Sequence, residues 1–134
     1  MLDLFAGIGS ISFEFASRGT QHIICVDKHF NSLRFIKKTA EEFSLPIQTI
    51  KSDAYTFLEK TSSKHTIIFA DPPYEFTVEQ LSKIITLVFD KEMLTDDGML
   101  IIEHSKQTDV SKNKHFSYSK KYGGSVFSFF EKNE

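Results

Sequence analysis

Apolar positions follow two alternating periods along this chain. Short apolar runs rich in β-branched residues, typical of strands, alternate with segments whose apolar residues recur at the i, i+3, i+4 or i+7 spacing of a helix. Four such repeats start from expected strands at residues 1–5, 22–26, 47–50 and 66–70. A strand at 99–103 and a hairpin at 116–130 that turns at Gly123-Gly124 complete the pattern. This alternation predicts an α/β fold, in which helices cover both faces of a mostly parallel sheet.

The helical segments carry apolar stripes that are expected to pack on the sheet. A first helix is expected to end near Gly19, and the others lie near residues 31–43, 53–58 and 78–89. The stripes comprise Ile8, Ile11 and Phe15, then Leu33, Ile36, Ala40 and Phe43, and finally Leu81, Ile84, Ile85 and Val88. Asp97-Gly98 is expected to form a turn before the strand at 99–103.

Size and composition indicate one globular domain, residues 1–134, with 40% apolar residues. No apolar run reaches the roughly 20 residues that a membrane span needs. The single cysteine, Cys25, lies in an expected strand, so we predict a buried, reduced thiol and a cytoplasmic location. Because the chain opens inside its first strand, we expect further N-terminal sequence in the full gene product.

The net charge of −2 argues against nucleic-acid binding by bulk electrostatics. It leaves room for a local basic surface. Five lysines gather towards the C-terminal end: Lys106, Lys112, Lys114, Lys120 and Lys121. A solvated surface and a nucleic-acid-binding face both remain open for them.

The first expected strand ends in a glycine loop with the sequence Asp3-Leu4-Phe5-Ala6-Gly7-Ile8-Gly9. Glycines allow a tight turn and a close approach of the backbone to a ligand. A dinucleotide-binding loop would carry a third glycine at position 12, where this chain has Ser12. The loop alone is therefore a weak indication of a ligand site.

Acidic residues at the ends of the expected strands strengthen the interpretation as a nucleoside site. Asp27 follows the second strand, twenty positions after Gly7, where a carboxylate can accept hydrogen bonds from ribose hydroxyls. Asp53 follows the third strand and is placed to meet an adenine amino group. Asp3 is placed to orient the loop or to meet an amino group. Asp27 and Asp53 are also good residues for capping the helices that follow, and this alternative stays open.

The fourth expected strand ends in Asp71-Pro72-Pro73-Tyr74. Two prolines remove backbone donors, so this segment presents mainly acceptors and suits a substrate that donates, such as an –NH₂ group. The Asp71 side chain and the Pro72 carbonyl would hold the amino hydrogens and stabilise positive charge in the transition state. Tyr74 would stack on the base. A rigid turn without catalytic function is the alternative.

Together, these motifs resemble those of class I amino-methyltransferases. The glycine loop, Val26-Asp27, Ser52-Asp53-Ala54 and Asp71-Pro72-Pro73-Tyr74 are most similar to the RsmD family, as are residues 7–19 and Lys121-Tyr122-Gly123. The resemblance implies a Rossmann-like sheet of seven strands with the last antiparallel, S-adenosylmethionine as cofactor, and methylation of guanine N2 in small-subunit ribosomal RNA. It implies catalytic residues Asp71, Pro72, Pro73 and Tyr74. The implied cofactor-binding residues are Asp3, Phe5, Gly7, Gly9, Asp27, Lys28, Asp53 and Ala54. The family also carries an N-terminal segment ahead of the glycine loop.

Other functions remain as alternatives. The same Asp-Pro-Pro-Tyr element serves adenine-N6 methylation of DNA, and a truncated or degenerate domain would bind a nucleoside without turnover. Histidine spacing and one cysteine disfavour a zinc site. Glu103 and His104 are weak candidates for substrate contact, with surface residues as the favoured interpretation. We expect a monomer that acts on ribosomal RNA or on a small-subunit assembly intermediate, with no metal and no membrane.

Overall fold

A computed structural model describes residues 1–133, which form seven strands and four helices. In chain order they are β1 (Leu2–Leu4), α1 (Ser10–Ser17), β2 (Ile23–Asp27), α2 (Phe30–Glu42), β3 (Ile47–Lys51), α3 (Ala54–Lys60), β4 (His65–Ala70), α4 (Val78–Asp90), β5 (Leu94–Ser105), β6 (Phe116–Tyr122) and β7 (Ser125–Phe130). The expected alternation of strands and helices, followed by a hairpin, is confirmed.

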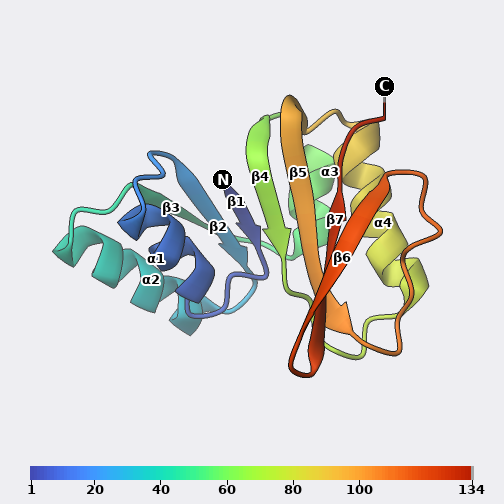
Figure 1. Ribbon diagram of the computed structural model, residues 1–134. Coiled ribbons are helices and arrows are strands. Elements are labelled where there is room, and N and C mark those ends of the chain that lie inside the picture. Colours follow the sequence, from blue (N-terminus) through green and yellow to red (C-terminus); the bar gives the residue numbers. More distant parts are fainter. Residues whose placement is uncertain (134) are drawn as a thin grey trace.

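All seven strands belong to one sheet, in the order β3-β2-β1-β4-β5-β7-β6 (Figure 1). The strands from β1 to β5 pair in parallel, whereas β7 is antiparallel to both of its neighbours, β5 and β6. The chain proceeds outward from β1 through β2 to β3 and then returns to β4, on the other side of β1. The strand order therefore reverses between β1 and β4, and open α/β sheets bind their ligands outside the carboxyl ends of the strands at such a point.

Side-chain alternation along the strands divides the core into two clusters, one on each face of the sheet. Leu2 and Leu4 of β1 pack with residues of α3 and α4. Ile23 and Cys25 of β2 pack on the opposite face with residues of α1 and α2. Figure 1 shows α1 and α2 together beside β1–β3, and α3 and α4 together beside β4 and β5. The predicted helices on both faces are confirmed, and the central strands are held from both sides.

Side-chain caps fix the starts of the two later helices. Thr77 and Gln80 form a reciprocal capping box at α4, in which each side chain accepts the other residue's backbone N–H. The Asp53 side chain accepts the N–H of Thr56 and caps α3. The N-cap residues of the two earlier helices, Gly9 for α1 and His29 for α2, make no side-chain capping hydrogen bond.

Three expectations from the periodic pattern are wrong. Ile8 precedes α1 and is 63% exposed, because the loop continues through Gly9 before the helix begins. Phe43 follows the last residue of α2 and is 64% exposed, so the buried stripe ends at Ala40. The segment 95–98, which contains Asp97-Gly98, lies within β5 as a bulge between two residues paired with β4, Leu94 and Met99.

Candidate functional site

A cavity of about 450 Å³ lies at the carboxyl ends of β1, β2, β3 and β4. Its volume falls within the range of small-molecule sites, roughly 300–1,000 Å³. The cavity is lined by Phe5, Gly7, Val26, Asp27, Lys28, His29, Ser52, Asp53, Ala54, Tyr55, Asp71, Pro73 and Phe76. The lining thus combines the glycine loop, the acidic residues at the strand ends and part of the 71–74 segment in one site.

The glycine loop reverses direction through three residues with positive φ: Phe5, Gly7 and Gly9. Positive φ is unfavourable for a residue with a side chain, such as Phe5, and hydrogen bonds of the neighbouring backbone stabilise this conformation. The N–H of Ala6 donates to the carbonyl of Val26 at 2.9 Å. These contacts bring the loop against the end of β2.

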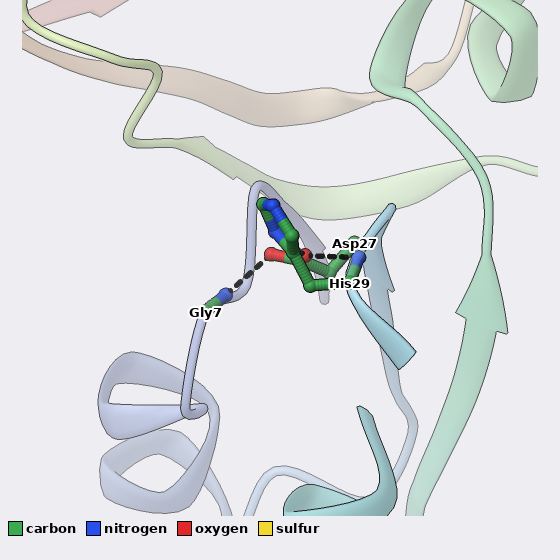
Figure 2. Close-up of polar contacts among 3 residues, drawn as sticks. All are labelled: Gly7, Asp27 and His29. Atoms are coloured by element: carbon green, nitrogen blue, oxygen red, sulfur yellow. Dashed lines mark hydrogen bonds and ion pairs between the residues drawn. The ribbon is translucent and has the colours of Figure 1, made fainter. Parts of the chain in front are cut away.

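Asp27 connects this loop to the end of β2 (Figure 2). Its Oδ2 accepts the backbone N–H of Gly7 at 2.8 Å. Its Oδ1 accepts the backbone N–H of His29 at 2.8 Å and also contacts His29 Nδ1 at 3.0 Å. A carboxylate offers about four acceptor positions, and these contacts use three of them. One position therefore remains free for a ligand. A second becomes free if the exposed imidazole of His29 turns away. Asp27 does not cap α2, whose N-cap residue is His29 without a side-chain hydrogen bond.

Asp3 lies beneath the loop and is buried, outside the cavity lining. Its Oδ2 accepts the hydroxyl of Ser12 at 2.7 Å, and Ser12 Oγ in turn accepts the Cys25 thiol at 3.0 Å. Burial raises the pKa of Asp3 to about 7, and the nearby Asp71 and Asp27 carboxylates act in the same direction. The predicted burial of Cys25 is confirmed, and burial raises its pKa to about 12. Position 12 therefore holds a serine whose hydroxyl links β1 to β2.

Asp53 caps α3, which was one of the two roles that the sequence left open for it. Its Oδ1 accepts the N–H of Thr56 at 3.0 Å, and its Oδ2 accepts the Thr56 hydroxyl at 2.6 Å. These bonds lower the pKa of Asp53 and keep it ionised. Asp53 is nevertheless exposed and lines the cavity beside Ala54, which is buried.

Aromatic rings form an apolar wall of the cavity. Tyr55 and Phe76 lie nearly parallel, with ring centroids 6.4 Å apart, and Phe5 meets Phe76 edge-on at 5.7 Å. Sequence reasoning missed Tyr55, Phe76 and His29 as lining residues. His29 and Tyr55 each lie two positions after an acidic residue that was selected, whereas Phe76 lies in a loop whose path no periodic signal indicates.

Asp71 lies at the mouth of the cavity as an exposed residue, although surrounding protein atoms partly desolvate its carboxyl group. This desolvation raises its pKa to about 6, and the negative charge of Glu103 acts in the same direction. Glu103, a weak candidate from the sequence, therefore lies close enough to Asp71 to affect it electrostatically.

Tyr74 lies over the β6–β7 turn, outside the cavity lining. Its hydroxyl donates to the Gly124 carbonyl at 3.0 Å and lies 2.8 Å from Ser125 Oγ, while the residue remains 55% exposed. The 71–74 segment therefore spans from the cavity mouth to the hairpin. Pro73 lines the cavity, and Pro72 is buried behind it.

His104 is buried, so the expectation of a surface residue is wrong for it. Its Nδ1 lies 2.9 Å from the Ser105 carbonyl and its Nε2 lies 2.7 Å from Ser128 Oγ. Because a carbonyl only accepts, Nδ1 donates to Ser105 in this arrangement, and Nε2 forms a second hydrogen bond with the Ser128 hydroxyl. His104 thus joins β5 to β7 rather than facing a substrate.

The cavity brings together eight of the twelve predicted site residues: Phe5, Gly7, Asp27, Lys28, Asp53, Ala54, Asp71 and Pro73. Asp3, Gly9, Pro72 and Tyr74 lie around it without lining it. Among residues 1–133, no group of three or more His, Cys, Asp or Glu side chains is arranged to hold a metal ion. No helix within these residues has the length and apolar character needed to cross a membrane.

The strand order, with β7 antiparallel and a cavity at the β1/β4 reversal, defines a Rossmann-like class I methyltransferase fold. The sequence model of the family described as "Conserved hypothetical protein 95" matches residues 1–131, and the chain belongs to this family. The resemblance predicted from the motifs is confirmed.

Individual relatives agree with this assignment. The chain is 33% identical to YlbH of Bacillus subtilis over 114 residues, which cover 81% of this chain and 61% of YlbH. It is 31% identical over 104 residues to the ribosomal RNA small subunit methyltransferase D of Escherichia coli, covering 76% of this chain and 51% of that protein. The chain thus spans about half to three fifths of the length of these curated relatives. The crystal structure of HI0767 from Haemophilus influenzae superposes with a TM-score of 0.85 at 22% identity, covering 99% of this chain and 86% of that chain, which shows the shared fold.

Proposed function

We propose that this chain is the catalytic domain of an S-adenosylmethionine-dependent methyltransferase that modifies an exocyclic amino group of a nucleic-acid base. The observation that carries the proposal is one cavity that contains both Asp27 and Asp71. Asp27 is suited to hold a nucleoside, and Asp71 is suited to accept hydrogen bonds from an amino group. A donor and an acceptor of a methyl group would therefore meet at the carboxyl ends of β2 and β4, the two strands that flank β1.

The residues of the cavity fit a nucleoside cofactor in three respects. The Gly7 position has no heavy atom within 4 Å of an added Cβ, so the backbone is open to a close approach. Asp27 keeps acceptor capacity for a ribose hydroxyl beyond the bond to Gly7. Phe5, Tyr55 and Phe76 provide the apolar surface that a purine base prefers. S-adenosylmethionine would supply an electrophilic methyl group there.

Asp53 and Asp3 take more limited roles in this proposal. Asp53 already accepts two hydrogen bonds from Thr56, and its exposed carboxylate has positions left for an adenine amino group. Asp3 supports the loop through Ser12 and is too deeply buried to be a direct contact in this arrangement. Ala54 and Lys28 contribute to the cavity wall at the two neighbouring strand ends.

On the acceptor side, the 71–74 segment would orient the amino group. We assign the carboxylate of Asp71 and the carbonyl of Pro72 to the amino hydrogens. The carbonyl of Pro73 accepts the N–H of Phe76 at 3.0 Å and so holds the shape of the segment. These acceptors would favour the positive charge that develops on the nitrogen in the transition state. Tyr74 would stack on a base that has been turned out of its helix or is already unpaired.

We further propose that the substrate is guanine N2 in small-subunit ribosomal RNA, free or within an assembly intermediate. The support is family membership and the name of the Escherichia coli relative, ribosomal RNA small subunit methyltransferase D. Adenine N6 in DNA is the second candidate, because the same acceptor segment would serve that amino group. A monomer in the cytoplasm is the corresponding expectation for the state and location of the protein.

The proposal is tested by calorimetric titration of the chain with S-adenosylhomocysteine. Saturable binding is expected to weaken strongly in Asp27→Ala and to remain unchanged in Asp97→Ala, an exposed aspartate remote from the cavity. Absence of binding by the folded chain would contradict the cofactor site.

Methyl transfer from labelled S-adenosylmethionine to ribosomal RNA then tests catalysis. Asp71→Ala is expected to lose most of the activity while keeping the fold and cofactor binding. An Asp71→Ala variant with full activity would overturn the mechanism. A chain that binds the cofactor and transfers no methyl group to RNA or DNA would indicate a non-catalytic domain.

A further inference from the structure

The β6–β7 hairpin presents a row of aromatic side chains on one of its two faces. Direct partners across antiparallel strands share a face, and the register pairs Tyr118 with Phe129, Lys120 with Phe127 and Tyr122 with Ser125. We call the set Tyr118, Lys120, Tyr122, Phe127 and Phe129 the hairpin face. Its two tyrosines are 41% and 61% exposed.

The rings of the hairpin face hold one another in place. Tyr118 stacks on Phe129 with centroids 4.4 Å apart and planes 9° from parallel. Tyr122 meets Phe127 edge-on at 5.5 Å. The Lys120 ammonium lies 6.0 Å from the centroid of the Tyr118 ring. The hairpin thus offers supported, exposed tyrosine rings with a cation beside them.

The hairpin face adjoins the candidate active site. β6 runs in the same direction as β5, so its last residue, Tyr122, lies at the sheet edge where β1 and β4 end. At this edge the Tyr74 hydroxyl bonds to Gly124 and Ser125 in the hairpin turn. Figure 1 shows the turn of β6 and β7 at the end of the molecule where the β5 arrow ends. A ligand that extends outward from Tyr74 therefore meets Tyr122 first and Tyr118 further along β6.

The charge around the hairpin differs in sign from that of the whole chain. Residues 104–122 contain five lysines and one carboxylate, Asp109, which gives this segment a charge of +4 in a chain whose net charge is −2. The segment includes β6 and the connection that leads to it. A polyanion would be attracted to this part of the molecule and repelled by the remainder.

We propose that the hairpin face binds unpaired RNA nucleotides that flank the base held at Tyr74. Bases would stack on Tyr122 and Tyr118, and Lys120 would contact the phosphate backbone. This proposal rests on the proposed function in assigning a nucleic acid to the site. It adds to that function a second RNA-binding surface and the requirement that the nucleotides flanking the target base be single-stranded.

The composition of the hairpin face favours RNA over a protein partner. Aromatic side chains suit either partner, so the lysine decides: a protein interface core is depleted in lysine, whereas Lys120 lies between the two tyrosines along β6. Stacking on a tyrosine requires an exposed ring, which Tyr118 and Tyr122 both provide. Stacking is also tolerant of base identity, so the surface would hold RNA while the cavity selects the base.

The test is fluorescence anisotropy with a labelled single-stranded RNA of about ten nucleotides, a length within the range that small single-strand-binding folds occupy. Tyr122→Ala is expected to weaken binding at least about fivefold, the lower end of what one stacked base contributes. Tyr122→Phe keeps the ring and is expected to bind as the native chain does. Lys120→Gln is expected to reduce the salt dependence of binding by about 0.7 in the logarithmic slope, the value for one phosphate contact on a single strand.

Phe43→Ala is the matched control, since Phe43 is 64% exposed after α2, outside the hairpin. Circular dichroism checks that each variant is folded. Equal affinity of Tyr122→Ala, Tyr118→Ala and the native chain would overturn the proposal, as would equal affinity for a duplex of the same sequence. Such equal affinities are expected if the hairpin face packs against a protein instead of RNA.

The outcome is separable from that of the proposed function. Titration with S-adenosylhomocysteine reports on the cavity, which contains no residue of the hairpin face. If the native chain does not bind S-adenosylhomocysteine but binds RNA through the two tyrosines, the methyltransferase proposal alone is contradicted. Cofactor binding with RNA affinity that does not depend on the tyrosines would contradict the hairpin proposal alone.

Discussion

The carboxylate of Asp27 accepts the backbone N–H of Gly7 at 2.8 Å and thereby ties the end of β2 to the loop after β1. The same residue accepts the N–H of His29 with its other oxygen. Because Asp27 is buried to 8% exposure, these donors have little access to water as a substitute partner. One side chain thus shapes the loop and lines the cavity that the loop encloses.

Asp27→Asn should therefore destabilise the fold as well as weaken binding at the proposed cofactor site. An amide offers one acceptor oxygen, so one of the two backbone N–H groups would face an NH₂ group. A buried donor without a partner costs about 1–3 kcal/mol. Urea denaturation of the variant would measure this loss.

Asp53→Asn is the control for this prediction. Asn caps a helix as well as Asp does, and Asp53 is exposed, so the stability of this variant should stay close to that of the native chain. Equal stability of the Asp27→Asn variant and the native chain would show that the Gly7 bond is dispensable.

Asp3 gives a pH-dependent prediction. Its pKa in the fold is about 7, against about 3.9 in an unfolded chain. The folded state therefore binds this proton more tightly, and the resulting stability is fully present below about pH 4 and is lost as the pH rises through about 7. Asp3→Asn removes the charge and keeps an acceptor for the Ser12 hydroxyl. The variant should exceed the native chain in stability by about 1–3 kcal/mol at pH 8, and by less at pH 5.

Urea denaturation at these two pH values would measure the difference. The variant could instead be less stable than the native chain by the same amount at both pH values. That result would show that the hydrogen bond of Asp3 to Ser12 contributes more to stability than burial of its charge costs.

Asp71 gives a prediction for activity. To stabilise the positive charge that develops on the nitrogen, Asp71 must be ionised, and its pKa is raised to about 6 by partial burial and by Glu103. Methyl transfer should therefore decline as the pH falls through about 6. Glu103→Gln removes one cause of the raised pKa, so the decline should move to lower pH. A pH profile of single-turnover methyl transfer would measure both, and a decline that does not move would exclude Glu103 as the neighbour that matters.

Local patterns predicted the elements of this fold well. The hairpin limits, 116–122 and 125–130, agree with β6 and β7 because Gly123-Gly124 leaves no alternative turn nearby. Ile8 and Phe43 were misplaced for the same reason at opposite helix ends. Periodicity indicates which residues share a face, whereas loop geometry and caps decide where a helix starts and stops.

The strand-end rule also predicted most of the cavity. This rule does not predict contacts between distant segments. The Ser12–Asp3 hydrogen bond joins α1 to β1, and Tyr74 contacts Gly124, 50 residues further along the chain. Stacking of Tyr74 on a base stays a prediction, and the hydroxyl of this residue bonds to Gly124 and Ser125 in the hairpin turn. Such a contact depends on the order of strands in the sheet, which no local pattern in one sequence encodes.

The two glycines of the loop provide a paired prediction. Gly9 has φ +86°, and a Cβ added there would lie 2.9 Å from Ile36 Cγ1, a side chain that is fully buried. Gly7 has φ +58°, and a Cβ there would have no neighbour within 4 Å. Gly9→Ala should therefore combine backbone strain with overpacking, at about 2–5 kcal/mol, whereas Gly7→Ala should show strain alone, at about 1–2 kcal/mol.

Cofactor binding should respond in the reverse order, because Gly7 lines the cavity and Gly9 does not. Under conditions in which both variants are folded, S-adenosylhomocysteine should bind Gly7→Ala more weakly than it binds Gly9→Ala. Urea denaturation gives the first comparison and calorimetry gives the second. If Gly9→Ala lost more affinity than Gly7→Ala, the cofactor would have to approach the loop beside α1 and away from the Asp27 cavity.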